Sequence, residues 1–195
     1  MNPQSDPFAG ASDAAVLAAF ANGDQQAARI LTQRLLPRVL AQATRMLANP
    51  TEAEDVAQDA MMRLWKIAPA WRQDEAQVST WLYRVVANLC TDRLRKRRGG
   101  LSLDQVAEPM DSAPSVAANM QTQTRMKALS DALAQLPERQ AQAVALRHLE
   151  GLSNPDIAQI MDISVRSVES LTARGKRALA DLMAGRKAEL GYDDD

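Results

Sequence analysis

The chain has 195 residues, enough for one ordinary domain or for two small ones of roughly 60–90 residues each. Aromatic residues make up only 4% of it and hydrophobic residues 46%, carried by Ala, Leu, Val and Met, which favour helices over strands. The formal net charge of -1 excludes a uniformly basic surface, so nucleic-acid binding would require local clusters of Lys and Arg. We predict an all-α protein.

The single cysteine and the N-terminal segment indicate a cellular location. Cys90 has no partner for an intramolecular disulfide, which suits a reducing cytoplasm. Residues 1–12 have neither a basic start nor an apolar run, and we expect them to be disordered. No stretch approaches the roughly 18 apolar residues of a membrane span. We therefore expect a soluble, cytoplasmic protein.

Four helices are predicted in the first half of the chain. Apolar positions at helical spacing extend over residues 13–47, interrupted at Asn22-Gly23-Asp24, and Pro37 is expected to kink or divide the second helix. Thr51 and Glu54 form a capping-box pattern for the third helix, which ends at Pro69. The fourth helix is expected over about residues 79–97.

The third and fourth helices carry opposite charge. The segment 52–59 has four acidic residues and no basic one, on a helix whose other face is apolar, and such a face suits a basic protein surface. The segment 84–98 has six basic residues and one acidic residue. Stepping 100° per residue places five of its polar residues within about 40° of one line: Arg84, Asn88, Thr91, Arg95 and Arg98.

Aromatic residues accompany this basic ridge. Trp71, Trp81 and Tyr83 lie close to it in sequence, and the combination suits unstacked bases better than a plain duplex. A solvated helix end, with cations near the C-terminal dipole, would give a similar pattern. Single-strand capture is one of two open interpretations at this point.

A segment rich in small polar residues divides the chain. Residues 100–124 contain two prolines and three acidic residues, and they contain no basic residue. A structureless stretch of this length is unusual inside a compact domain. We therefore expect a first domain over 13–99, a flexible linker over 100–124, a second domain over 125–187 and an acidic tail over 188–195.

The second domain has the sequence form of a helix-turn-helix. Ser153 and Asp156 form a capping box for a short helix, Asp162 lies in a turn, and Ser164 caps a last long helix. The second helix of such a motif enters the major groove, where exposed side chains reach base edges. The candidates for base contact are Arg166, Ser167, Ser170, Arg174 and Arg177, with Lys176 for phosphate. An ordinary helical hairpin with a charged face is the alternative.

The sequence lacks the common patterns of catalytic residues. His148 is the only histidine and lies among residues expected to pack, so we interpret it as structural. There is no phosphate-binding Gly-rich loop, no His/Cys metal cluster, and no histidine at motif spacing from Cys90. We predict no catalytic residue, no cofactor and no metal, and a protein that is not an enzyme.

Three segments in this order resemble a known family. They are TEAEDVAQDAMMRLW, then VSTWLYRVVANLCTDRLRKRR, and, after the linker, LPERQAQAVALRHLEGLSNPDIAQIMDISVRSVESLTARGKRALADL. The chain resembles the extracytoplasmic-function (group IV) sigma factors of the sigma-70 family, similar to the envelope-stress sigma factor, over about residues 13–183. The resemblance implies two small helical domains, sigma regions 2 and 4, and a monomer that directs core RNA polymerase to promoters, in a stress response and under an anti-sigma factor.

The resemblance also implies roles for matched residues. The family's acidic helix docks on the beta-prime clamp helices of core polymerase, and here it corresponds to Asp55, Gln58, Asp59 and Met62. The segment that melts the minus-ten element, holds a flipped base and contacts phosphates corresponds to Trp81, Tyr83, Arg84, Asn88, Arg95, Arg97 and Arg98. The minus-35 element would be read by the last helix, through Arg166, Ser167, Glu169, Ser170, Ala173, Arg174, Lys176 and Arg177.

The sequence departs from the family pattern in the last helix. Glu169 and Leu171 stand where many members carry a basic residue, and Ala173 is small. The promoter sequence that other members recognise therefore cannot be assigned to this chain. Asp162 replaces a common glycine at the turn, a position that Asp tolerates better than most residues.

Two other functions would account for parts of this sequence. A helix-turn-helix repressor or response-regulator output would bind a palindromic operator as a symmetric dimer, but it leaves the acidic helix and the aromatic-basic segment unexplained. An enzyme of phosphodiester chemistry would need a carboxylate cluster for metal binding, whereas the acids near Asp55 lie along one helix.

Overall fold

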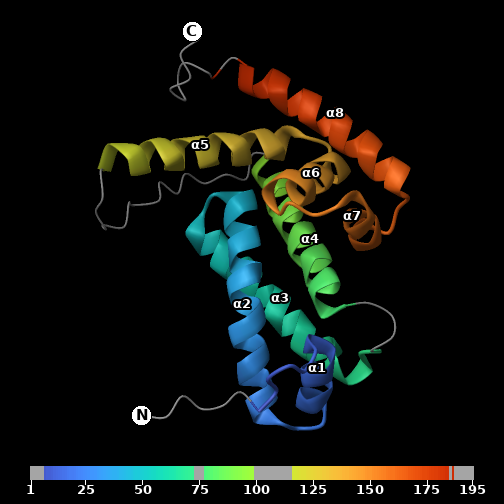
Figure 1. Cartoon of the computed structure of the whole chain (residues 1–195). Coiled ribbons are helices and arrows are strands. Elements are labelled where there is room, and N and C mark those ends of the chain that lie inside the picture. Colours follow the sequence, from blue (N-terminus) through green and yellow to red (C-terminus); the bar gives the residue numbers. More distant parts are fainter. Residues whose placement is uncertain (1–6, 73–76, 99–115, 185, 187–195) are drawn as a thin grey trace.

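The computed structural model describes residues 7–72, 77–98, 116–184 and 186. For residues 116–119 it describes the backbone alone. All regular structure in these ranges is helical, as predicted (Figure 1). The first half contains α1 (Asp13–Ala21), α2 (Gln25–Leu47), α3 (Pro50–Ile67), the short 3-10 helix η1 (Ala68–Ala70) and α4 (Val78–Arg98). Within the described ranges, each helix is too short or too polar to cross a bilayer.

Local signals fix the helix ends of the first domain. Asp24 caps α2 by accepting hydrogen bonds from the backbone N–H groups of residues 26 and 27. Pro37 lies inside α2 without dividing it, and its exposed ring faces solvent. The predicted capping box of Thr51 and Glu54 is wrong, because α3 begins at Pro50 and its N-cap is Asn49. Asn49 Oδ1 accepts from the backbone N–H of Glu52, and proline is favoured at the first helical position.

The second half contains α5 (Val116–Gln135), α6 (Glu138–Val144), a π-helical turn η2 (Ala145–Leu149), α7 (Asn154–Met161) and α8 (Val165–Ala184). Pro137 separates α5 from α6, as its fixed φ and missing N–H predict. Helix α5 begins inside the segment 100–124 that we expected to be linker. Ala, Met and Gln in residues 117–123 are good helix formers, and they extend α5 into the segment despite its small polar residues.

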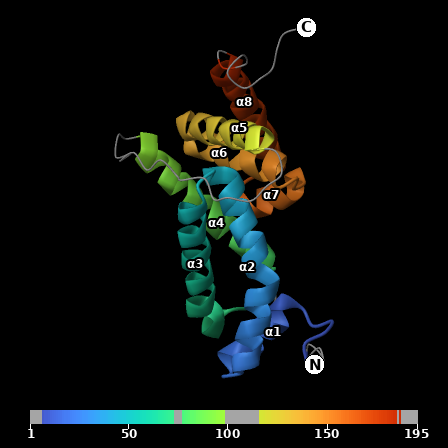
Figure 2. The same ribbon diagram turned by 90° about the vertical axis from the view of Figure 1, so that its left-hand side faces the viewer.

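The two halves pack on each other through α4 and the C-terminal part of α2. Helices α2, α3 and α4 run side by side, α5 crosses their upper ends, and α6 and α7 lie against α4 (Figures 1 and 2). The main hydrophobic cluster continues from α1–α4 into Leu133, Leu136 and Val144 of the second half. A second cluster joins Ala87 of α4 to the α7–α8 unit. The hydrophobic cores of the two halves are therefore shared at this boundary.

Candidate polymerase and nucleic-acid interfaces

The acidic face of α3, defined by Asp55, Gln58, Asp59 and Met62, points to solvent. Its opposite side carries the buried residues Val56, Ala60, Met61 and Leu64, which anchor α3 on the core. Met62 is 62% exposed, an unusual position for a large apolar side chain. The face combines negative charge with an accessible methionine, which suits contact with a basic protein surface.

Two arginines border the acidic face. Arg63 donates from Nε and Nη2 to the two carboxylate oxygens of Asp59, at 3.0 and 3.1 Å, one turn along α3. Arg93 of α4 lies 3.6 Å from Asp55, measured from Nη1 to Oδ2. Both pairs are solvent-accessible, so each contributes at most about 1 kcal/mol and does not prevent the carboxylates from meeting another partner.

The helix-turn-helix has the predicted local geometry. Ser153 caps α7 in a reciprocal capping box with Asp156. Asp162 adopts the left-handed conformation, with φ 53°, and so turns the chain between α7 and α8. Ser164 Oγ accepts from the backbone N–H of Ser167 at 3.2 Å at the start of α8. The capping signals that the sequence predicted are confirmed at both helices.

Helix α8 presents the predicted DNA-reading residues on one exposed side. Val168 and Gly175 are buried against the rest of the domain, while most of the predicted contact residues are exposed. Ser167 is half-buried, and its hydroxyl lies 2.8 Å from that of Ser164. The exposed residues are Arg166, Glu169, Ser170, Ala173, Arg174, Lys176 and Arg177.

His148 lies beside this surface and was interpreted wrongly from the sequence. It is exposed in the π-helical turn and not part of the core. Partial burial, with Lys176 and Arg147 nearby, lowers its pKa below the usual 6.5. The inserted π turn rotates the helix end, so the side chain that periodicity predicts to be inside points outward.

The aromatic residues near the basic ridge lie at the start of α4. Trp71 and Trp81 form an edge-to-face pair with ring centroids 6.1 Å apart. Trp81 is half-buried and packs on the main cluster, and Tyr83 is half-buried against the second cluster. These side chains are held by packing, with part of each accessible.

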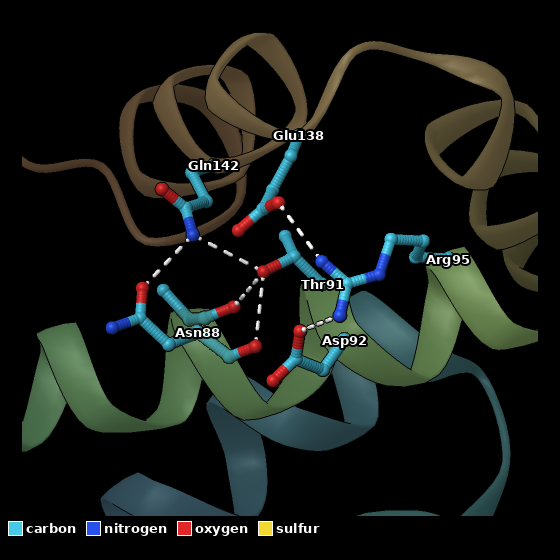
Figure 3. Close-up of polar contacts among 7 residues, drawn as sticks. Asn88, Thr91, Asp92, Arg95, Glu138 and Gln142 are labelled. Atoms are coloured by element: carbon cyan, nitrogen blue, oxygen red, sulfur yellow. Dashed lines mark hydrogen bonds and ion pairs between the residues drawn. The ribbon is translucent and has the colours of Figure 1, made fainter.

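The middle of the ridge meets the second domain. Gln142 of α6 donates from Nε2 to Asn88 Oδ1 at 2.9 Å and to Thr91 Oγ1 at 3.1 Å (Figure 3). Arg95 donates to Asp92 at 2.7 Å and reaches Glu138 of α6 at 3.4 Å. Thr91 is buried, so part of the predicted ridge is an internal contact and not solvent-exposed.

The other arginines of α4 differ in their contacts, and Arg84 and Arg98 are both exposed. The Arg84 guanidinium donates to the backbone carbonyls of Gln159 and Ile160 in α7. Arg97 donates to the Leu47 carbonyl at 3.1 Å, to Ser130 and to Glu52, and so ties α4 to its neighbours. Arg98 is exposed at the end of α4.

A polar cavity of about 390 Å³ remains between the two halves. Arg84 and Asn88 line it from α4, and Arg139, Gln142 and Asp162 line it from the second domain. Two of the side chains that the sequence predicted to contact the minus-ten element, Arg84 and Asn88, therefore face the second domain across this cavity.

Comparison with known proteins assigns both halves. Residues 31–99 match the model of Sigma-70 region 2, and residues 126–179 match that of Sigma-70, region 4. The chain is 35% identical to the ECF RNA polymerase sigma factor SigM of Mycobacterium tuberculosis over 173 residues, covering 88% of this chain and 85% of that protein. It is 31% identical to the ECF RNA polymerase sigma-E factor of Escherichia coli K12, covering 80% and 86%.

Solved structures show the same fold. CnrH in complex with the cytosolic domain of CnrY superposes with a TM-score of 0.62 at 24% identity, covering 89% of this chain and 97% of that one. The sigma factor RpoE in complex with the anti-sigma factor NepR from Bartonella quintana gives 0.56 at 22% identity, covering 80% and 96%.

Two helical domains of the region 2 and region 4 types, in this order, define a sigma-70-type transcription initiation factor. The chain belongs to the extracytoplasmic-function (ECF) sigma factors. It acts by binding core RNA polymerase and directing it to promoters, as the motif resemblance predicted.

Proposed function

We propose that the acidic face of α3 is the surface through which this sigma factor docks on core RNA polymerase, at the beta-prime clamp helices. The exposed Met62 carries the proposal, because a docking face that combines carboxylates with an accessible apolar side chain can bury area as well as pair charge. The pairs that Asp55 and Asp59 make with arginines are weak enough to exchange for a partner's basic residues.

Charge reversal tests this docking surface. In Asp55→Arg with Asp59→Arg, we expect loss of co-elution with core RNA polymerase in size-exclusion chromatography, while the helical circular dichroism spectrum is kept. The matched control is Glu138→Arg with Asp181→Arg, which makes the same change in net charge at exposed residues outside α3. Co-elution of the α3 variant at the level of this control would contradict the assignment.

Promoter contact is divided between the two domains. In this proposal the α4 segment holds the melted minus-ten strand, with Trp81, Tyr83 and Asn88 at bases and Arg95 and Arg98 at phosphates. The exposed side of α8 reads the minus-35 element in the major groove, led by Arg174. Support comes from the uncovered arginines of α8 and from the aromatic pair at the start of α4.

Regulation by an anti-sigma factor is the second part of the proposal. Its support is the family assignment, together with solved relatives that were captured with such partners, CnrH with CnrY and RpoE with NepR. Acting in the cytoplasm in a stress response, the chain would be held inactive until a signal releases it. Affinity purification from the native host before and after envelope stress tests this: we expect a small protein that co-purifies only before stress and suppresses run-off transcription when added back.

A further inference from the structure

The exposed side of α8 carries one acidic residue among basic ones. Over residues 165–177 the single acidic residue is Glu169. The basic residues of the same stretch are Arg166, Arg174, Lys176 and Arg177. Helix α8 lies at the edge of the molecule, with its other side against α6 and α7 (Figure 1). A duplex that meets the exposed side brings closely spaced phosphates, so a carboxylate there weakens non-specific binding. Phosphate binding therefore does not account for Glu169.

Stability of the fold does not account for Glu169 either. The side chain is exposed, and within the described residues its carboxylate makes no hydrogen bond and no ion pair. The start of α8 is capped by Ser164, which accepts from the backbone N–H of Ser167. The helix dipole stabilises carboxylates in the first turn of a helix, and Glu169 lies in the second turn of α8. We therefore looked for a role of this carboxylate toward a ligand.

Glu169 lies in the part of α8 that would enter the major groove. The buried side of α8 is defined by Val168 and Gly175. At 100° per residue, Glu169 lies about 110° around the helix from that side, and Ala173, one turn further on, about 150°. In a helix-turn-helix, the N-terminal turns of the second helix contact base edges. The position of Glu169 is therefore one that reads bases.

The neighbours of Glu169 leave its carboxylate accessible. Ala173 is the next residue on the same face and Ser170 follows directly in sequence, and both are small and exposed. The nearest arginine toward the C-terminus, Arg174, donates from Nε to the Ser170 carbonyl at 3.2 Å. Its guanidinium is therefore held by the backbone of α8 itself, and a base edge can approach Glu169.

An ionised carboxylate discriminates among bases because it has acceptor atoms only. In the major groove, guanine presents the acceptors N7 and O6 and thymine presents the acceptor O4, and these repel a carboxylate. Cytosine presents the N4 amino group, which is a donor. Adenine presents the N6 amino group beside the acceptor N7, a pair that suits a side-chain amide better. Cytosine is therefore the base that matches Glu169 best.

We propose that Glu169 is a specificity-determining residue, which accepts a hydrogen bond from N4 of a cytosine in the minus-35 element. This rests on the proposed role of α8 as the reader of that element. The basic residues of α8 supply affinity for the phosphates of any duplex, whereas Glu169 lowers the affinity for duplexes without cytosine at one base pair. Its effect is mainly against wrong sequences, because a carboxylate that loses water beside guanine or thymine gains no donor in return.

The test measures base preference with the full chain bound to core RNA polymerase. A promoter recovered by run-off transcription is randomised over its minus-35 element, and the base frequencies at each pair are determined in the DNA that the holoenzyme retains. The variants Glu169→Ala, Glu169→Gln and Glu169→Arg are compared with the unmodified chain. The control is Asp181→Ala, which removes the same charge from an exposed position of α8 about 18 Å further along its axis.

We expect the unmodified chain to favour cytosine by about fivefold or more at one base pair, and Glu169→Ala to lose this preference. At the same pair, Glu169→Gln should shift the preference toward adenine and Glu169→Arg toward guanine, because an amide and a guanidinium match the groups of those bases. Asp181→Ala should keep the cytosine preference.

Affinity for single sequences distinguishes this role from that of a solvated charge. For Glu169→Ala, we expect tighter binding to duplexes that carry another base at the selected pair, because the repelling carboxylate is gone, and little gain on the cytosine duplex, where a hydrogen bond is lost as well. A solvated carboxylate predicts the same gain on every duplex, which is the result expected for Asp181→Ala. An equal gain on all duplexes for Glu169→Ala would overturn the proposal.

Unchanged base frequencies in Glu169→Ala would also overturn it, as would adenine in place of cytosine at the pair that responds. To separate this from failure of the proposed α8 site, Arg174→Ala is carried through the same selection. If Arg174→Ala changes the preference at a pair and Glu169→Ala changes none, the assignment of Glu169 falls and the α8 site stands. If neither variant changes any pair, the proposed reading of the minus-35 element by α8 falls with it.

Discussion

Gly175 of α8 crosses Val144 of α6 so closely that a Cβ at Gly175 would lie 2.6 Å from Val144 Cγ2 and 3.2 Å from the Gln140 carbonyl oxygen. The absence of a side chain at this one position sets how near the recognition helix lies to α6. The exposed arginines of α8 depend on this crossing for their placement.

Gly175→Ala is therefore expected to destabilise the protein. Overpacking costs typically about 1–3 kcal/mol, and the higher helix propensity of Ala recovers about 1 kcal/mol, so we expect a net loss of up to about 2 kcal/mol. The free energy of unfolding in urea measures this. Val144→Ala in the same chain removes the clashing methyl groups, and the cost of Gly175→Ala should be smaller in that background. An equal cost in both backgrounds would show that the crossing is not the cause.

Asp162→Gly is expected to stabilise the helix-turn-helix. Asp162 has φ 53°, a left-handed conformation that costs free energy for residues with a Cβ, though less for Asp than for most. Glycine removes this cost at the end of α7, and we expect a gain of about 0.5–1 kcal/mol. A lower midpoint of thermal unfolding for Asp162→Gly would mean that the carboxylate contributes more than the backbone strain costs.

Arg174 and Lys176 are expected to behave differently on promoter DNA. If Arg174 reads a base, Arg174→Ala should weaken binding to a promoter recovered by run-off transcription by about 1–3 kcal/mol and relax its sequence preference. Lys176→Ala should weaken binding to all duplexes alike and lower the slope of log affinity against log salt by about one. Equal losses for Arg174→Ala on promoter and random duplexes would assign Arg174 to phosphate.

Cys90 is expected to stay unreactive until the protein unfolds. Burial raises the pKa of its thiol from 9.0 to about 12, so the nucleophilic thiolate is scarce at neutral pH and is also inaccessible. Because the folded pKa is the higher one, its contribution to stability is complete below about pH 9 and is lost as the pH rises toward 12. Labelling with Ellman's reagent at pH 8 should follow the unfolding transition, and fast labelling of the native protein would contradict the buried position.

Much of the fold follows from signals within a few residues of each other. The reciprocal cap of Ser153 and Asp156, the turn at Asp162 and the break at Pro137 each act locally, so the sequence predicted them correctly. The start of α3 was predicted wrongly because two local signals compete there. Asn49 followed by Pro50 is a complete N-terminus, and it begins the helix before Thr51 can cap it.

Contacts between the domains could not be predicted in this way. Arg45 and Glu150 are 105 positions apart, and neither has a local feature that marks it as a partner of the other. The ridge of α4 was predicted from its period, but helical periodicity does not distinguish a face that meets DNA from one that meets another domain. His148 was placed inside because a π turn shifts the register of the helix, and the sequence carries no signal for that turn.

The central claim, a sigma factor that docks by α3 and directs initiation, is tested most directly by reconstitution with bacterial core RNA polymerase. The purified chain is mixed with core enzyme in reducing buffer, the complex is isolated by size exclusion, and run-off transcription is performed on sheared genomic DNA. The account predicts co-elution as a one-to-one complex and new transcripts from a small set of start sites. Failure to join the core enzyme, together with binding to duplex DNA as a symmetric dimer, would contradict it and favour a helix-turn-helix repressor.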